Sequence, residues 1–232
     1  MNNLILVTGG TGYIGSHTTI ELLEKGFEVV IIDNLSNSNI EVLDGIEKIT
    51  GKRPYFEQID LRDTERVNAF FKQYDQVKAI IHFAASKAVG ESVNQPLLYY
   101  RNNLLSLMNL LDNMSRQDVP YFVFSSSCTV YGEPDELPVS ENAPIKKANS
   151  PYGNTKQISE EIIQDTIHAD EKIKAISLRY SIPWELIPPL ILANYPWGSP
   201  KILCLSSHKL LQASGMSLKY LAMITIHPMA QQ

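Results

Sequence analysis

The chain has 232 residues, of which 44% are hydrophobic and 19% are charged, an ordinary composition for a globular protein. Its formal net charge of -5 offers no basic surface to nucleic acid. The two cysteines, Cys128 and Cys204, lie far apart, which argues against a disulfide framework or a metal site. We expect no signal peptide and no membrane span, and therefore a cytoplasmic location.

Short apolar runs alternate with longer amphipathic segments along residues 1–180. The runs have the composition of strands that are buried on both faces of a sheet. They cover residues 4–8, 28–33, 55–60, 78–84, 121–127 and 174–180. Helical spacing begins near Tyr13, Ser38, Asp63, Gln95 and Pro151. This alternation predicts an α/β fold with a doubly wound parallel sheet and flanking helices, with ligands bound beyond the carboxyl ends of the strands.

A glycine motif, TGGTGYIGSH, directly follows the first run and contains Gly9, Gly12 and Gly15. Between a strand and a helix, such glycines permit a tight turn, close approach of the backbone to a pyrophosphate, and close packing of helix on strand. Asp33 ends the second run, where a carboxylate would bind the adenosine ribose and repel a 2′-phosphate. The sequence therefore predicts binding of NAD rather than NADP. The alternative for Asp33 is a turn residue.

Tyr152 and Lys156 are spaced i, i+4 near the start of the last predicted helix. Pro151 suits the first helical turn, and Ser150 or Asn149 could cap it. An ammonium group beside a phenol lowers the phenol pKa from near 10, so Tyr152 could take a proton from an alcohol while hydride leaves the same carbon. The alternative is a surface pair on an amphipathic helix.

Hydroxyl groups follow the fifth run, in the sequence SSSCTVYG. We expect Ser126, Ser127 and Thr129 to emerge at the carboxyl end of this strand, where a substrate would lie next to the cofactor. Serine at the end of a strand is also common in loops that have no catalytic role.

Together, TGGTGYIGSH, Asp33-Asn34, HFAASKAVGES, YYRNN, SSSCTVYG and SPYGNTK resemble the extended short-chain dehydrogenase/reductase family, and within it the UDP-glucose 4-epimerases, from Leu4 to Tyr180. The resemblance implies a Rossmann-like fold and an isomerase of galactose metabolism. In the family reaction, tightly bound NAD oxidises the C4 hydroxyl of a UDP-sugar to a ketone. The 4-keto sugar then turns, and hydride returns to its opposite face. The family uses no metal and commonly forms homodimers through the helices near 96–115 and 151–169.

The resemblance also implies roles for individual residues. Tyr152 would be the acid/base, Lys156 would bind the nicotinamide ribose, and Ser127 and Thr129 would contact the sugar hydroxyl. The implied cofactor set further comprises Gly9, Gly12, Tyr13, Ile14, Gly15, Asp33, Asn34, Asn37, Ser38, Asp60, Leu61, Phe83, Ala84, Ala85, Lys87 and Asn102. From the residues alone, Phe83 and Ala84 could instead be core positions, and Asn102 a helix-turn residue.

Three alternatives remain. A nucleotide-sugar 4,6-dehydratase would carry an Asp-Glu pair where this chain has Cys128-Thr129, which argues against dehydration. A reductase acting on nucleotide sugars is a second alternative. A non-catalytic NAD-binding remnant is the third.

The composition changes abruptly after Tyr180. Residues 181–232 contain three lysines and Glu185 as their charged residues, and six of the 13 prolines. The family pattern RYFNPxGAHP is replaced here by RYSIPWELIP, which can be encoded one nucleotide out of step with that pattern. We hypothesise that residues 1–180 are the NAD-binding domain with the Tyr-x-x-x-Lys pair, and that residues 181–232 are an out-of-frame, poorly structured tail in place of the UDP-binding domain. On this hypothesis the chain is weakly active or inactive; a divergent folded extension is the alternative.

Overall fold

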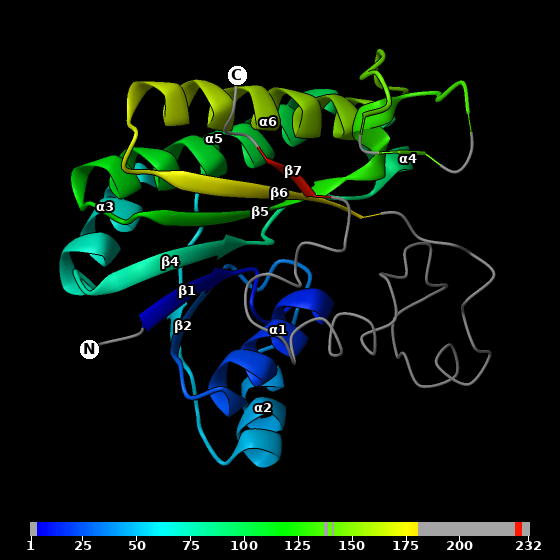
Figure 1. The fold of residues 1–232 in the computed structure, drawn as a ribbon. Helices are drawn as coiled ribbons and strands as arrows, with labels where there is room; N and C mark the ends of the chain where they lie inside the picture. Colours follow the sequence, from blue (N-terminus) through cyan, green and yellow to red (C-terminus); the bar gives the residue numbers. More distant parts are fainter. Residues whose placement is uncertain (1–3, 137–138, 141, 181–225, 229–232) are drawn as a thin grey trace.

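The computed structural model describes residues 4–136, 139–140, 142–180 and 226–228 (Figure 1). Its strands are β1 (Leu4–Thr8), β2 (Glu28–Asp33), β3 (Tyr55–Gln58), β4 (Val77–His82), β5 (Tyr121–Ser127), β6 (Lys174–Tyr180) and β7 (Ile226–Pro228). Its helices are α1 (Tyr13–Glu24), α2 (Val42–Thr50), α3 (Thr64–Gln73), α4 (Val89–Asn94), α5 (Pro96–Arg116) and α6 (Pro151–Ala169), with a 3-10 turn η1 (Cys128–Tyr131).

The sheet has the strand order β3-β2-β1-β4-β5-β6-β7. The first six strands are parallel, whereas β7 pairs antiparallel with β6. The predicted doubly wound α/β fold is therefore confirmed, and the sheet is Rossmann-like. Apart from β7, the tail for which we hypothesised a changed reading frame lies outside the described residues.

Helices cover both faces of the sheet: α1 and α2 lie on one face, and α3, α5 and α6 on the other (Figure 1). Each face has its own apolar core. Ile31 of β2 packs with Leu23 and Ile46 of α1 and α2, whereas Leu6 of β1 packs in the cluster that contains Leu110 of α5. Because neighbouring residues of a strand point to opposite faces, a central strand that is covered on both sides must be apolar throughout.

Four of the strands have the predicted bounds, but β3 differs in length and in burial. It ends at Gln58, and the side chain of Tyr55 is 56% exposed. The prediction that this run is buried on both faces was wrong because β3 is the edge strand of the sheet. Strand β4 spans Val77–His82 rather than 78–84.

The helix ends follow local sequence signals. The hydroxyl of Ser150 accepts a hydrogen bond from Gly153 N at 3.1 Å, and Pro151 occupies the first helical turn of α6, as predicted. Helix α2 begins at Val42, later than expected, after a turn in which the side chain of Asn39 accepts from Glu41 N. The short helix α4 was not predicted. Within the described ranges, no helix is long and apolar enough to cross a membrane.

Candidate active site

The glycine turn after β1 leaves no room for side chains at positions 9 and 15. Gly9 has φ +69°, and a Cβ there would lie 2.8 Å from the backbone nitrogen of Ala84. A Cβ on Gly15 would lie 2.2 Å from the carbonyl oxygen of Gly9. The turn after β1 therefore abuts the loop after β4, at the point where the strand order reverses and where open α/β sheets bind their ligands.

Helix α1 begins at this turn without a side-chain cap. Its N-cap is Gly12, which has no side chain to offer, and its first turn contains no acidic residue. Uncapped N–H groups at a helix N-terminus form a site that favours an anion such as a pyrophosphate. Tyr13 and Ile14 lie in the first turn, both half-buried.

Asp33 lies at the carboxyl end of β2 and is 7% exposed. Its carboxylate accepts hydrogen bonds from Thr11 N (3.3 Å), Leu35 N (2.9 Å) and the hydroxyl of Ser38 (3.1 Å). The structure thus brings Asp33 and Ser38 together beside the glycine turn, whereas Asn37 is exposed on the same loop.

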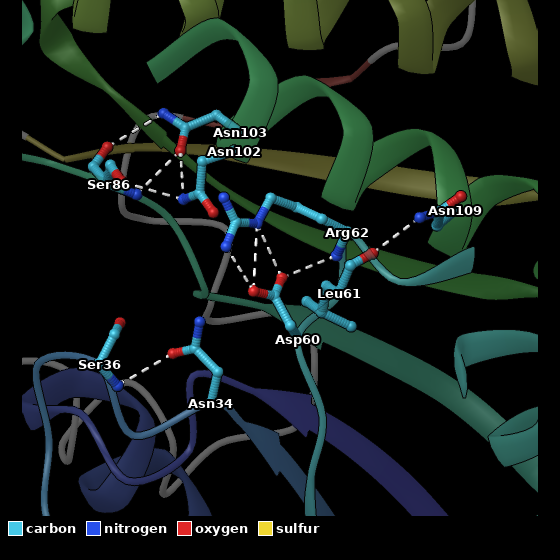
Figure 2. A network of polar contacts seen from close by, with 9 residues as sticks. All are labelled: Asn34, Ser36, Asp60, Leu61, Arg62, Ser86, Asn102, Asn103 and Asn109. Carbon is cyan, nitrogen blue, oxygen red and sulfur yellow. Dashed lines mark hydrogen bonds and ion pairs between the residues drawn. The ribbon is translucent and has the colours of Figure 1, made fainter. Parts of the chain in front are cut away.

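A polar hollow of about 510 Å³ continues from this point and is lined by Asn34, Gln58, Asp60 and Arg66. The guanidinium of Arg62 donates to Asp60 Oδ2 from Nη2 at 2.6 Å. Hydrogen bonds from Arg62 hold the pKa of the Asp60 carboxyl below its usual value, although partial burial acts in the opposite direction. In the view of Figure 2, the guanidinium of Arg62 lies between Asp60 and Asn102 of α5.

Leu61 faces the interior next to this hollow. Its side chain is 5% exposed, and its carbonyl oxygen accepts from Asn109 Nδ2 at 2.8 Å (Figure 2). The structure therefore brings Asp60 and Asn34 to the same hollow, with Leu61 beside them.

The loop after β4 is joined to α5 by asparagine side chains. Asn102 Nδ2 donates to the hydroxyl of Ser86 at 3.0 Å, and Asn103 Oδ1 accepts from Ser86 N at 2.8 Å (Figure 2). Asn103 is 4% exposed and also donates to Thr155 Oγ1 of α6 at 3.1 Å. Sequence reasoning named neither Ser86 nor Asn103, although both directly adjoin residues that it did name.

The other residues predicted in this loop differ in burial. Phe83, Ala84 and Ala85 are half-buried, and Lys87 is exposed. Phe83 packs against one apolar cluster and Ala84 against the other, each with part of its side chain exposed.

Lys156 is buried at the carboxyl end of β5, with 4% of its surface exposed. Its Nζ donates to the carbonyl oxygen of Ser125 at 2.7 Å and lies 5.9 Å from the centre of the Tyr152 ring. Burial lowers the pKa of Lys156 from 10.5 to about 8, and the negative charge of Glu160 opposes this shift. Because the lysine is buried and its ammonium lies near the tyrosine ring, the two residues are not the surface pair that was considered as the alternative.

The hydroxyl groups after β5 separate into two environments. Ser127 Oγ accepts from Thr129 Oγ1 at 3.0 Å, and a Cβ on Gly153 would lie 3.3 Å from Thr129 Cβ, so α6 begins directly beside these hydroxyls. Ser126 instead points into the interior, is 3% exposed, and donates to the carboxylate of Glu160. The expectation that Ser126 faces a substrate was wrong, because alternate residues of a strand point to opposite faces.

Comparison with known proteins gives a consistent result. Residues 5–183 match the NAD dependent epimerase/dehydratase family. The chain is 47% identical over 200 residues to UDP-glucose 4-epimerase uge1 of Schizosaccharomyces pombe, covering 84% of this chain and 56% of that protein. It is also 47% identical over 196 residues to UDP-glucose 4-epimerase of Bacillus subtilis, covering 84% and 57%. The chain thus spans little more than half the length of the curated relatives it matches.

Solved structures agree in fold. UDP-glucose 4-epimerase from Bifidobacterium longum, in complex with NAD+ and UDP, superposes with a TM-score of 0.74 at 43% identity, over 77% of this chain and 53% of that one. The UDP-Glc/GlcNAc 4-epimerase of Campylobacter jejuni has a TM-score of 0.74 at 34% identity, over 91% of this chain and 61% of that one.

Proposed function

The chain belongs to the NAD-dependent epimerase/dehydratase family, and from this premise we propose that it binds NAD and acts on a UDP-sugar as a UDP-glucose 4-epimerase, interconverting UDP-galactose and UDP-glucose. The observation that carries the proposal is the buried Lys156 ammonium beside Tyr152, at the end of the strand that also presents Ser127. The relatives named above carry this activity in their names.

In this proposal, residues 1–180 are the NAD-binding domain, and the described residues fit a dinucleotide. A side chain at Gly9 or Gly15 would collide with the backbone of Ala84 or of Gly9, so the glycines allow the tight turn and the close packing that the dinucleotide motif requires. The carboxylate of Asp33 would accept hydrogen bonds from the adenosine ribose, with Asn34, Asn37 and Ser38 around it. Asp60 and Leu61 would flank the adenine. The groove toward the nicotinamide would be lined by Phe83, Ala84, Ala85, Lys87 and Asn102.

The proposed chemistry assigns the proton to Tyr152. Bound NAD supplies a reversible hydride acceptor for the hydrogen on C4. The Tyr152 phenolate, favoured by the Lys156 ammonium, takes the proton of the C4 hydroxyl as the carbon is oxidised to a ketone, and gives it back when the opposite face is reduced. Ser127 and Thr129 would hold the reacting oxygen in reach of the phenol.

The proposal has two further parts: the chain does not dehydrate its substrate, and two copies of it form a dimer. Thr129 and Cys128 stand where a dehydratase would need a carboxylic acid/base pair, so we propose epimerisation without loss of water. We also propose a homodimer through α5 and α6, whose described surface includes the exposed side chains of Leu97, Leu105 and Met108.

Two measurements on the full chain test the proposal. Calorimetry measures NAD binding, and a coupled assay measures conversion of UDP-galactose. Tyr152→Phe should reduce kcat by roughly 10²–10⁴-fold while leaving NAD binding within a few-fold. Tyr121→Phe, which removes the same hydroxyl from an exposed tyrosine at the far end of β5, is the matched control and should not change kcat.

Each outcome has a defined meaning. Binding with Tyr152-dependent turnover supports the epimerase. Binding without turnover supports the non-catalytic NAD-binding remnant instead, and absence of both contradicts the proposal. Weak or absent turnover of this chain stays a prediction, and the same coupled assay tests it.

A further inference from the structure

The hydroxyl of Tyr99 on α5 holds the point where the loop after β4 becomes helix α4. Tyr99 is fully buried, with 0% of its surface exposed. Its Oη accepts a hydrogen bond from Ala88 N at 3.0 Å and donates one to Glu91 Oε2 at 2.6 Å. Ala88 is the N-cap residue of α4 and Glu91 lies in its first turn, so this one hydroxyl ties the start of α4 to α5.

Helix α4 depends on such contacts because it is short. It spans six residues, and the side chain of its N-cap residue makes no hydrogen bond. Isolated helices shorter than about 12 residues are marginal in water, so most of the stability of α4 must come from tertiary contacts. Burial and the bond to Glu91 raise the pKa of Tyr99 to about 12, so its hydroxyl keeps its proton and remains a donor at neutral pH.

Lys87 lies between two backbone N–H groups that side chains of α5 hold. On one side, Ser86 N donates to Asn103 Oδ1 at 2.8 Å (Figure 2). On the other side, Ala88 N donates to Tyr99 Oη at 3.0 Å. The side chain of Lys87 itself is exposed. The backbone is therefore fixed on both sides of the lysine, while its ammonium stays accessible to a ligand.

We propose that Tyr99 is a positioning residue for the cofactor: by holding Ala88 and Glu91, its hydroxyl fixes the loop in the conformation that presents the Lys87 ammonium to the bound dinucleotide. This inference rests on the proposed function, in which Lys87 lines the cofactor groove. Tyr99 is not a catalytic residue, because its hydroxyl contacts the start of α4 and acts on the cofactor through the lysine.

The loop that carries Lys87 lies against the glycine turn. A Cβ on Gly9 would lie 2.8 Å from Ala84 N, and Ala84 N donates to Thr8 Oγ1 at 3.4 Å. Lys87 follows Ala84 by three residues, which span at most about 11 Å. An ammonium group held at this distance from the turn attracts the negative charge of a pyrophosphate, and more strongly when the backbone that carries it does not have to be ordered on binding.

A double-mutant cycle of Tyr99→Phe and Lys87→Met in the full chain tests the inference, with NAD binding measured by calorimetry. Lys87→Met removes the ammonium and should weaken NAD binding by about tenfold or more, as loss of a charged hydrogen-bond donor does. Tyr99→Phe keeps the lysine but frees the start of α4, and should weaken NAD binding by about 3–10-fold. In the Lys87→Met background, Tyr99→Phe should change the affinity by less than about twofold, because the group through which it acts is gone.

Tyr74→Phe is the matched control. The hydroxyl of Tyr74 also donates to a glutamate, Glu57 Oε1 at 2.9 Å, and burial also raises the pKa of Tyr74 to about 12. Tyr74 follows α3 just before β4 begins, and therefore lies at the edge of the sheet opposite the carboxyl ends of the strands. Tyr74→Phe should leave the NAD affinity unchanged with either residue at position 87.

Circular dichroism reports whether Tyr99→Phe folds. If it does not, Glu91→Ala takes its place, because it removes the acceptor of the Tyr99 hydroxyl at an exposed position. It should likewise be more harmful to NAD binding in the presence of Lys87 than in the Lys87→Met background.

A merely structural role for Tyr99 predicts the same fold-loss of NAD affinity in both backgrounds, and that result overturns the inference while NAD binding by the wild-type chain still stands. A wild-type chain that binds no NAD overturns the proposed function and this inference together.

Discussion

The side-chain amide of Asn103 on α5 donates to Thr155 Oγ1 on α6 across 3.1 Å, although 52 residues separate the two in sequence. The same amide donates to the carbonyl oxygen of Ser86 at 3.0 Å. Thr155 in turn donates to the carbonyl oxygen of Tyr152. One buried asparagine thus holds the loop after β4 in register with the turn of α6 that carries the proposed acid/base.

Asn103→Ala should therefore destabilise the fold strongly. It would leave the N–H and C=O groups of the half-buried Ser86 without their partner, at a cost of about 1–3 kcal/mol in the free energy of unfolding. Urea denaturation monitored by circular dichroism measures this loss. Asn102→Ala is the matched control: its side chain is half-buried and bonds the Ser86 hydroxyl, so we expect a cost of about 1 kcal/mol or less. Equal losses in the two variants would show that Asn103 has no special role.

Gly15→Ala should impair both folding and cofactor binding. Its Cβ would lie 2.2 Å from Gly9 O and 2.8 Å from Gly10 Cα, so the turn after β1 would have to move. We expect a loss of about 1–3 kcal/mol in the free energy of unfolding and at least a roughly tenfold loss of NAD affinity by calorimetry. Gly45→Ala, in α2 with open space around it, should instead be neutral or stabilise by about 0.5–1 kcal/mol. Equal changes in the free energy of unfolding and in NAD affinity for Gly15→Ala and Gly45→Ala would contradict the prediction.

Asp33→Asn should weaken NAD binding by roughly 10–100-fold, because hydrogen bonds from the ribose to a charged carboxylate contribute about 1.5–3 kcal/mol. The ratio of NADP to NAD affinity should rise, since the like-charge repulsion of a 2′-phosphate is removed. Calorimetry with both cofactors measures the ratio, which a loss of fold alone would not change. Asp44→Asn, an exposed acid in α2, serves as the charge control. An unchanged ratio of NADP to NAD affinity would indicate that Asp33 only stabilises the loop with which it forms hydrogen bonds.

His82 should make the protein sensitive to mild acid. It is buried at the end of β4, bonded through Nδ1 to Thr8 Oγ1 at 2.7 Å, and burial lowers its pKa from 6.5 to about 3. The unfolded chain binds a proton below pH 6.5 that the folded protein does not bind until about pH 3. The contribution of His82 to stability is therefore present above pH 6.5 and is lost as the pH falls from there toward 3, by up to about 1.4 kcal/mol per pH unit.

His82→Asn, which can still accept a hydrogen bond from Thr8, should flatten this dependence. The free energy of unfolding, measured by urea denaturation at several pH values, would then fall less steeply below pH 6.5 than in the wild-type protein. His168→Asn, at an exposed position near the end of α6, should leave the slope unchanged. Parallel slopes for the wild type and His82→Asn would rule out His82 as the source of acid sensitivity.

Several features of this protein are determined by sequence alone, because they depend on local patterns. Apolar runs and helical spacing predicted the parallel sheet and most of its strand limits, since periodicity reflects which faces are buried. The glycine spacing predicted the tight turn between β1 and α1, and Ser150-Pro151 predicted the start of α6. Tyr152 and Lys156 could be paired from their i, i+4 spacing, which is a property of any helix.

Other features are decided only by the tertiary structure, because they depend on which distant elements meet. The edge position exposes Tyr55 of β3, and only the order of the strands shows that this strand has a neighbour on one side alone. Strand β5 directs Ser126 inward to Glu160, whereas the hydroxyl of Ser127 meets that of Thr129. The hydrogen bonds between Ser86 and Asn103 likewise form only when the loop after β4 packs against α5. Hydrogen bonds of this kind form between side chains whose spacing in sequence carries no period, so only the folded chain brings them together.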